Sequence, residues 1–206
     1  MSPRPPSMTA MHRCLPSALA GSLIAGVAMS FGQTYAPEAL APLFNSATPV
    51  VALAALVALA CRGGWWAHAL LGASAGPLAM VGYYATTSLR GFPVGMRMVG
   101  FWVVAGVVSG LVMGVAVWLL QGHGDPVLRG AAAGAFPAVA LGEAAHGLRR
   151  IADTTPSSYW WVQAAVGVAV LAWLMVARLT SWPARLAAVA VAVLGARALF
   201  AVYGMA

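Results

Sequence analysis

The chain has 206 residues, of which 62% are hydrophobic and 7% are charged. Because soluble domains carry about 25% charged residues, this composition excludes an ordinary soluble fold and predicts an integral membrane protein. The net charge of +7 comes from 11 basic residues, all of them arginines, and 4 acidic residues. The arginines are scattered singly rather than gathered into a basic patch, so nucleic-acid binding is rejected.

The hydrophobic pattern predicts an all-α fold, a polytopic transmembrane bundle of six to seven spanning helices with no soluble domain. Residues 1–13 are polar and proline-rich and are predicted to form a disordered tail, followed by a single transmembrane helical domain over residues 14–206. The expected spans cover residues 15–31, 46–61, 66–86, 98–120, 127–147, 160–178 and 184–203. The second and fifth runs are the weakest, which leaves six as the alternative count.

The first apolar run also has the outline of a secretory signal peptide, with a positive flank, an apolar core and small residues beyond it. The run is long for a signal core and further spans follow it. A retained first helix is therefore the preferred interpretation.

Arginines in the short loops predict the orientation of a multi-pass protein of the cell membrane. One side of the membrane would hold slightly more arginines than the other, and placing that side in the cytoplasm also places the N-terminus there. The cytoplasmic ends would hold Arg4, Arg13, Arg62, Arg129, Arg178 and Arg185, and the outer loops would hold Arg90, Arg97, Arg149 and Arg150.

Glycines four residues apart mark three of the predicted helices as surfaces for close packing, because the missing side chain lets helix backbones approach. Packing within the chain is the expected role, and a homodimer seam is the alternative. The glycines concerned are Gly72, Gly76, Gly106, Gly110, Gly114, Gly130 and Gly134.

Charged groups at membrane depth are costly, so Glu143 and His146 near the end of the fifth span point to a functional face. Arg197 lies 12 residues past Arg185, or about 18 Å along its span, and Glu143 lies 14 residues past Arg129, or about 21 Å along its own. Since the two spans run in the same direction, we predict that Glu143 and Arg197 share a depth and form a buried ion pair. The alternative is that Arg197 reaches outward to the headgroups.

Further polar and aromatic residues are expected at the same outer end of the bundle as Glu143. They are Asn45, Tyr83, Tyr84 and Trp102. Because ligand pockets combine apolar walls with a few convergent polar groups, we predict an outward-facing pocket lined by these four residues together with Glu143, His146 and Arg197. The surplus of arginine favours an anionic ligand, and interface anchoring or helix capping is the alternative for each residue.

No catalytic residue, metal-ligand set or cofactor is predicted. Glu143-x-x-His146 matches half of a di-iron helix signature, but that site needs a second copy and two more carboxylates, and the chain has only four acids. His68 and His146 are expected at opposite ends of the bundle, which argues against a shared haem. No serine or cysteine is expected beside a general base that a third group orients, as nucleophilic catalysis requires.

Short motifs give the chain a resemblance to a known group of proteins. They are NSATPV at 45–50, VGYY at 81–84, FW at 101–102 and GE at 142–143. The chain resembles a family of small actinobacterial multi-pass membrane proteins classed as a domain of unknown function. The resemblance implies a six- or seven-helix core without an established activity, and the residues that carry it are Asn45, Ser46, Gly82, Tyr83, Tyr84, Trp102 and Glu143.

The architecture is also similar to that of the substrate-binding subunits of energy-coupling-factor importers, although no ligand motif matches. The preferred function is therefore binding or transport of a small molecule through the outward-facing pocket. A non-catalytic accessory or assembly subunit of a membrane complex is the first alternative, and an intramembrane enzyme is the second. The expected partners are the lipid bilayer, a small-molecule ligand, and a membrane partner subunit or a second copy of the chain.

Overall fold

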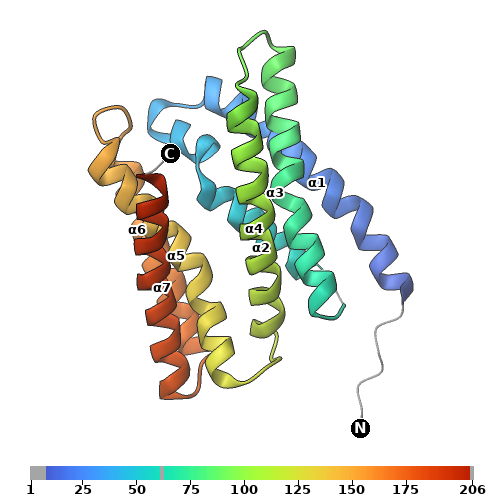
Figure 1. Cartoon of the computed structure of the whole chain (residues 1–206), viewed down its shortest axis with the longest axis vertical. Helices are drawn as coiled ribbons and strands as arrows, with labels where there is room; N and C mark the ends of the chain where they lie inside the picture. Colours follow the sequence, from blue (N-terminus) through green and yellow to red (C-terminus); the bar gives the residue numbers. More distant parts are fainter. Residues whose placement is uncertain (1–7, 61–62, 205–206) are drawn as a thin grey trace. The chain divides into compact units, whose positions relative to one another are not determined.

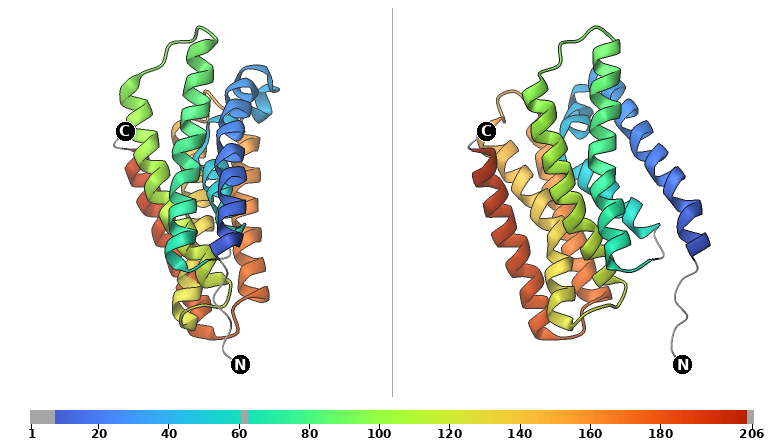
Figure 2. Two further views of the ribbon diagram at one scale, coloured as in Figure 1. Left: turned by 90° about the vertical axis from the view of Figure 1, so that its right-hand side faces the viewer. Right: turned by 45° about the vertical axis from the view of Figure 1, so that its right-hand side comes forward.

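The computed structural model describes residues 8–60 and 63–204, with side chains from residue 16 onward. The described residues contain helices and no β-strand, so the all-α prediction is confirmed for them (Figure 1 and Figure 2). The elements are α1 (Met8–Tyr35), the 3-10 helix η1 (Glu38–Asn45), α2 (Ala47–Leu59), α3 (Trp65–Leu89), α4 (Met96–Leu120), α5 (Pro126–Arg150), α6 (Ser157–Ala177) and α7 (Trp182–Tyr203).

The helices coincide with the seven predicted apolar runs, but most extend beyond them. The largest extension is at the start of the chain, where α1 begins at Met8 although residues 1–13 were expected to form a disordered tail. Three prolines lie before Met8 and the next one is Pro16, so the segment between them contains no proline to oppose a helix. Residues 1–7 of the predicted tail, Cys61 at the end of the second run and Arg62 after it lie outside the described residues.

Two helix ends follow directly from local sequence. After α3, Gly91 has φ +82°, and its N–H donates to the Ser88 carbonyl at 3.0 Å while the N–H of Phe92 donates to the Thr87 carbonyl at 3.2 Å. This is a Schellman ending, which needs a residue in the left-handed conformation that glycine adopts without strain. At the start of α5, the Asp125 carboxylate accepts from the N–H groups of the next two non-proline residues, at 2.7 and 3.0 Å, and Pro126 occupies the first turn.

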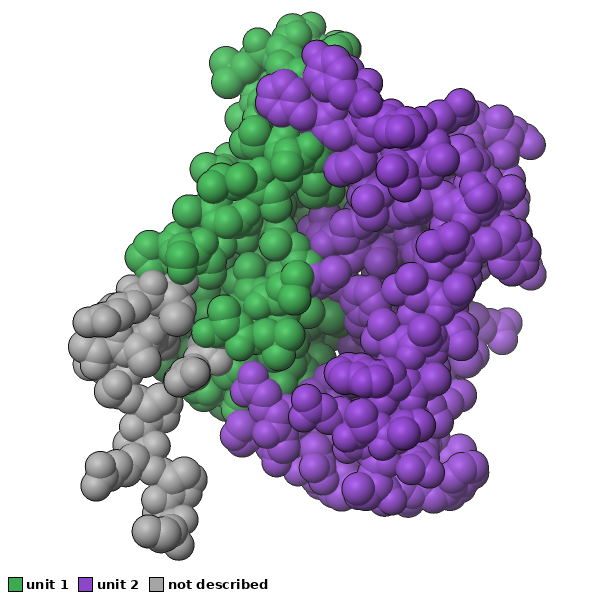
Figure 3. All heavy atoms as spheres, turned by 180° about the vertical axis from the view of Figure 1, so that it is seen from behind, with its two compact units in different colours: residues 1–30, 53–118 green, residues 31–52, 119–206 purple. Residues whose placement is uncertain are grey.

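The chain divides into two compact units (Figure 3). Unit 1 comprises residues 1–30 and 53–118, and unit 2 comprises residues 31–52 and 119–206. The boundary between the two units crosses α1 after Ser30, α2 after Ala52 and α4 after Trp118. The sequence predicts one helical domain over residues 14–206, and the division into two compact units does not test that prediction.

Unit 1 is built from α1, α3 and α4, which touch through their glycines. A Cβ at Gly72 would collide with the backbone of Gly110, and one at Gly76 would lie 2.8 Å from the Cα of Gly106. Gly114 meets the backbone of His68 in the same way. Since the α3 residue number falls as its α4 partner's number rises, the two helices are antiparallel and their backbones are in direct contact.

Unit 2 places α5 against α6 and α7, which run beside it in every view (Figure 2). Twelve of the 25 residues of α5 are buried, and most of these are alanine or glycine. Gly130, Gly134 and Gly142 face Ala184, Ala188 and Ala196 of α7 at backbone contact. Each α7 residue is 54 positions after its α5 partner, so the two helices are parallel and in constant register.

Three described helices are long and apolar enough to cross a membrane, namely α4, α6 and α7. The number becomes four if η1 and α2, which are bent by 55° at their junction, are counted together as one broken span or re-entrant segment. The outer faces of α6 and α7 carry exposed large apolar side chains, such as Val176 at 83% and Leu194 at 66% exposure. The described chain is therefore compatible with a membrane protein.

Candidate functional site around Glu143

Glu143 is an extensively hydrogen-bonded side chain of unit 2. It lies on the buried face of α5 and is only 5% exposed. Its two carboxylate oxygens accept six hydrogen bonds, which come from the start of α2, from α6 and from α7. These six donors are two backbone N–H groups, three hydroxyls and one amide.

The strongest of these contacts join Glu143 to the first turn of α2. The N–H of Ala47 donates to Oε1 at 2.7 Å, and the N–H of Thr48 donates to Oε2 at 2.9 Å. The hydroxyls of Ser46 and Thr48 donate to Oε2 at 2.8 and 2.7 Å. The first N–H groups of a helix have no partner within the helix and lie at the positive end of its dipole. Glu143 therefore caps α2 from a distant part of the chain.

Polar groups of α6 and α7 complete the site. The Gln163 amide donates to Oε2 of Glu143 at 3.2 Å and to the Ala140 carbonyl at 3.2 Å. The Tyr203 hydroxyl donates to Oε1 at 3.2 Å. Tyr159 lies in an outer layer, where its hydroxyl donates to Oγ of Ser46 at 3.2 Å. One carboxylate thus ties together α2, α5, α6 and α7.

The predicted ion pair between Glu143 and Arg197 is wrong, although its premise about depth holds. Glu143 and Arg197 are 54 positions apart, which is the register of the parallel α5–α7 contact. Arg197, however, is exposed. It follows the inward Ala196 by one residue, which turns it about 100° away from α5. The structure shows Arg197 pointing outward, and its reach to the headgroups, which was the alternative, stays a prediction.

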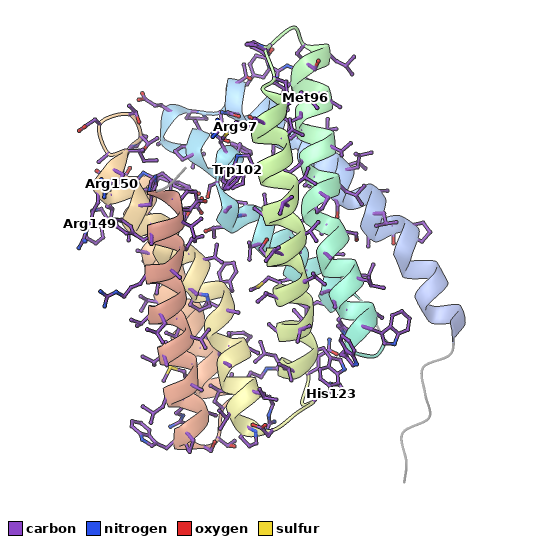
Figure 4. The ribbon with its side chains drawn as sticks, in the orientation of Figure 1. Met96, Arg97, Trp102, His123, Arg149 and Arg150 are labelled. Atoms are coloured by element: carbon purple, nitrogen blue, oxygen red, sulfur yellow. The ribbon has the colours of Figure 1, made fainter. Side chains whose placement is uncertain are left out.

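His146 lies beside the site without bonding to Glu143. Its ring is 4.8 Å from the ring of Tyr203 and 6.3 Å from that of Phe200. Its Nδ1 is buried and has no hydrogen-bond partner among the described residues. Arg150 stacks over Phe200 at 5.8 Å, and Arg149 and Arg150 extend from the C-terminal end of α5 (Figure 4). His146 is therefore a partly buried side chain whose Nδ1 could form a further hydrogen bond, next to a carboxylate that already accepts six.

The other predicted pocket residues do not take part in these contacts. Asn45 precedes the Ser46 cap but is itself exposed. Tyr83 and Tyr84 form an edge-to-face pair on α3, and Trp102 projects from the beginning of α4 (Figure 4). All three aromatic residues belong to unit 1, whereas every group bonded to Glu143 belongs to unit 2. The candidate site is complete without them.

A surface hollow of about 570 Å³ opens where η1 faces the α5–α6 connection. It is lined by Glu38, Ala39 and residues 152–156, including Asp153. None of the residues predicted to line the pocket contributes to this hollow. No group of three or more His, Cys, Asp or Glu side chains that could hold a metal ion is present among the described residues.

Sequence reasoning missed four side chains of the site: Thr48, Tyr159, Gln163 and Tyr203. Gln163 carried the clearest signal, because an amide inside the apolar run 160–178 needs a buried partner. Thr48 lies two residues after Ser46, in a segment whose asparagine, serine and threonine are residues that favour the start of a helix. The two tyrosines lie near span ends, where an aromatic residue is ordinarily explained by the membrane interface.

Replacing Gln163 with leucine is expected to lower the free energy of unfolding by about 1–3 kcal/mol, because the Ala140 carbonyl and the carboxylate lose a buried donor. Thermal unfolding in detergent measures this change. Gln121, which is exposed after α4, provides the matched control, and its leucine variant should unfold like the natural protein. Equal unfolding midpoints for both variants would contradict the assigned role of Gln163.

Comparison with known proteins gives one result. The chain matches the family described as a family of unknown function (DUF6518) over residues 5–206. No curated protein and no solved structure gives a significant match. Since the match covers nearly the whole chain, the protein belongs to the DUF6518 family of unknown function.

Proposed function

We propose that the protein is a multi-pass integral membrane protein that binds or transports a small molecule at the break between η1 and α2. The observation that carries this proposal is the start of α2 at a 55° bend, with its first N–H groups held by a buried carboxylate. Discontinuous helices whose N-terminal ends meet anionic groups form the substrate sites of many transporters. Irregular backbone at membrane depth otherwise occurs only where protein covers it or a cavity adjoins it.

The proposed topology has six to seven spans with a cytoplasmic N-terminus. Besides the three strongly apolar helices, α1, α3 and α5 contain 28, 25 and 25 residues, and a helix needs about 20 residues to cross the hydrocarbon core. A central helix such as α5 needs less apolar character, because its neighbours cover it. We also propose an actinobacterial source for the protein. The proposed similarity to the substrate-binding subunits of energy-coupling-factor importers rests on architecture alone.

The proposed ligand is a small anion, because the first turn of α2 already accommodates a carboxylate. An anionic ligand would compete with Glu143 for the N–H groups of Ala47 and Thr48. His146 is the side chain best placed to hold it, since its Nδ1 has no partner and its ring contacts Tyr203.

Thermal unfolding with a panel of small carboxylates, phosphates and size-matched amines tests the binding proposal. We expect an anion to raise the unfolding midpoint of the natural protein, and replacing His146 with glutamine to weaken that binding about tenfold, the loss of one hydrogen bond to a charged group. The glutamine variant of His123, exposed in the α4–α5 turn, is the control. A panel in which no compound shifts the midpoint would contradict the proposal.

An accessory subunit is the second candidate function, and the filled hydrogen-bonding capacity of Glu143 favours it. If the carboxylate only holds α2, α6 and α7 together, the site is structural and the function lies on the outer surface. Purification in a mild detergent distinguishes the two, because an accessory subunit would bring a partner in fixed stoichiometry.

A further inference from the structure

One end of unit 2 carries a group of arginines that the Glu143 site does not involve. Arg129 and Arg185 are the fourth residues of α5 and α7, and Arg178 directly follows the last residue of α6. The acidic residue at this end is Asp125, and its carboxylate is bound to the first N–H groups of α5. This end of unit 2 is therefore positively charged.

Packing contacts of their chain neighbours bring the backbone positions of these arginines to the same end of unit 2. Gly130, next to Arg129, meets the backbone of Ala184, which is next to Arg185. Leu179, next to Arg178, belongs to a buried cluster with Ala133 and Ala184. The beginning of α5, the end of α6 and the beginning of α7 thus meet around the α6–α7 connection.

Two buried polar atoms in this region have no hydrogen-bond partner among the described residues. They are Nε of Arg129 and Oγ of Ser181. Ser181 is the residue before α7, yet its side chain makes no capping hydrogen bond to the helix. Buried polar groups are nearly always paired, and a helix N-terminus with an arginine donor is a favourable place for a phosphate oxygen.

The surface next to this end is apolar. Trp182 is 68% exposed and Val176 is 83% exposed, and Trp173 and Leu186 are also exposed large side chains on α6 and α7. Tryptophan favours the region between headgroups and hydrocarbon. An amphiphile bound here would place a negative headgroup at the arginines and its chains along α6 and α7.

From this arrangement we infer that Arg129, Arg178, Arg185 and Ser181 form a binding site for the phosphate headgroup of an anionic phospholipid. The inference rests on the membrane placement proposed above but not on a transported ligand. It assigns the arginines a specific lipid contact beyond the general attraction of basic residues to the cytoplasmic leaflet.

The experiment uses the full-length protein in non-ionic detergent, titrated with phosphatidylglycerol or phosphatidylcholine and observed by native mass spectrometry and thermal unfolding. Phosphatidylglycerol should bind in fixed stoichiometry and raise the unfolding midpoint, whereas phosphatidylcholine should not. The Arg178→Gln variant should bind about tenfold more weakly, which corresponds to one charge-assisted contact, and Arg129→Gln combined with Arg185→Gln should bind about a hundredfold more weakly, which corresponds to two. Arg178 is exposed, so its variant keeps the test valid if the double variant fails to fold.

The matched control replaces Arg149 and Arg150, exposed at the other end of α5, with glutamine. Equal loss in control and test variants would mean general electrostatic attraction and would overturn the assignment. Glycerol 3-phosphate binding as tightly as phosphatidylglycerol would also overturn it in favour of a soluble anion. Release of the protein from membranes by an alkaline wash would refute the membrane placement itself, while retention without any effect of the variants would refute the lipid site alone.

Discussion

Replacing Glu143 with alanine is expected to lower the free energy of unfolding by about 3–5 kcal/mol. The change leaves the N–H groups of Ala47 and Thr48 and the hydroxyls around them without their acceptor, and each buried unsatisfied donor costs about 1–3 kcal/mol. The isosteric Glu143→Gln change should also destabilise, because its amide N–H would face the backbone N–H of Ala47 or of Thr48, and a backbone N–H can only donate. Thermal and denaturant unfolding in one detergent would measure both variants.

Arg197 provides the control for this experiment at the same depth of unit 2. Its glutamine variant should unfold within about 0.5 kcal/mol of the natural protein, because the side chain is exposed and surface substitutions have small effects. If Glu143 and Arg197 were an ion pair, both variants would be destabilised and their effects would not be additive. A stable Glu143→Ala variant would show that α2 does not depend on this cap.

The second large effect is expected at Gly110, on the α3–α4 contact of unit 1. A Cβ there would be 2.6 Å from the carbonyl carbon of Gly72 and 3.0 Å from the Cα of Ala73. Since backbone cannot move aside as a flexible side chain can, Gly110→Ala should cost at least about 1–3 kcal/mol, measured as a fall in the unfolding midpoint.

Gly100 gives a matched comparison on the same helix. A Cβ at Gly100 would meet no atom within 4 Å, so Gly100→Ala should stabilise α4 by up to about 1 kcal/mol through helix propensity. The two substitutions are chemically identical, and opposite signs are expected. The same sign for both would show that propensity, and not the close approach of α3 and α4, decides the outcome at these glycines.

Much of the architecture could be predicted from the sequence because its signal is local. Long apolar runs separated by turn residues mark seven helical segments, and the four-residue glycine spacing marks surfaces that the structure places at backbone contacts. Counting residues along two parallel helices also placed Glu143 and Arg197 at one depth. These inferences need only the rise of a helix and the positions of its ends.

The partners of Glu143 could not be predicted in the same way. Depth depends on a residue's distance along the helix, but its direction depends on which face packs against a neighbour, and a one-residue step changes that direction by about 100°. The small residues of α7 give little indication of its inward face, so the sequence does not show that Tyr203, and not Arg197, faces Glu143. The capping of α2 is a contact between residues 95 positions apart, and no local pattern indicates it.

That separation has a consequence for how the protein is made. Synthesis runs from the N-terminus, so the first turn of α2 leaves the ribosome long before Glu143 exists. Gln163 and Tyr203 are made later still. The parallel contact between α5 and α7 forms only after α6, which connects the end of α5 to the beginning of α7, has been made. The start of α2 therefore lacks its Glu143 acceptor until the later helices are made, and nascent chains arrested before α5 should leave residues 46–48 open to water-soluble labels.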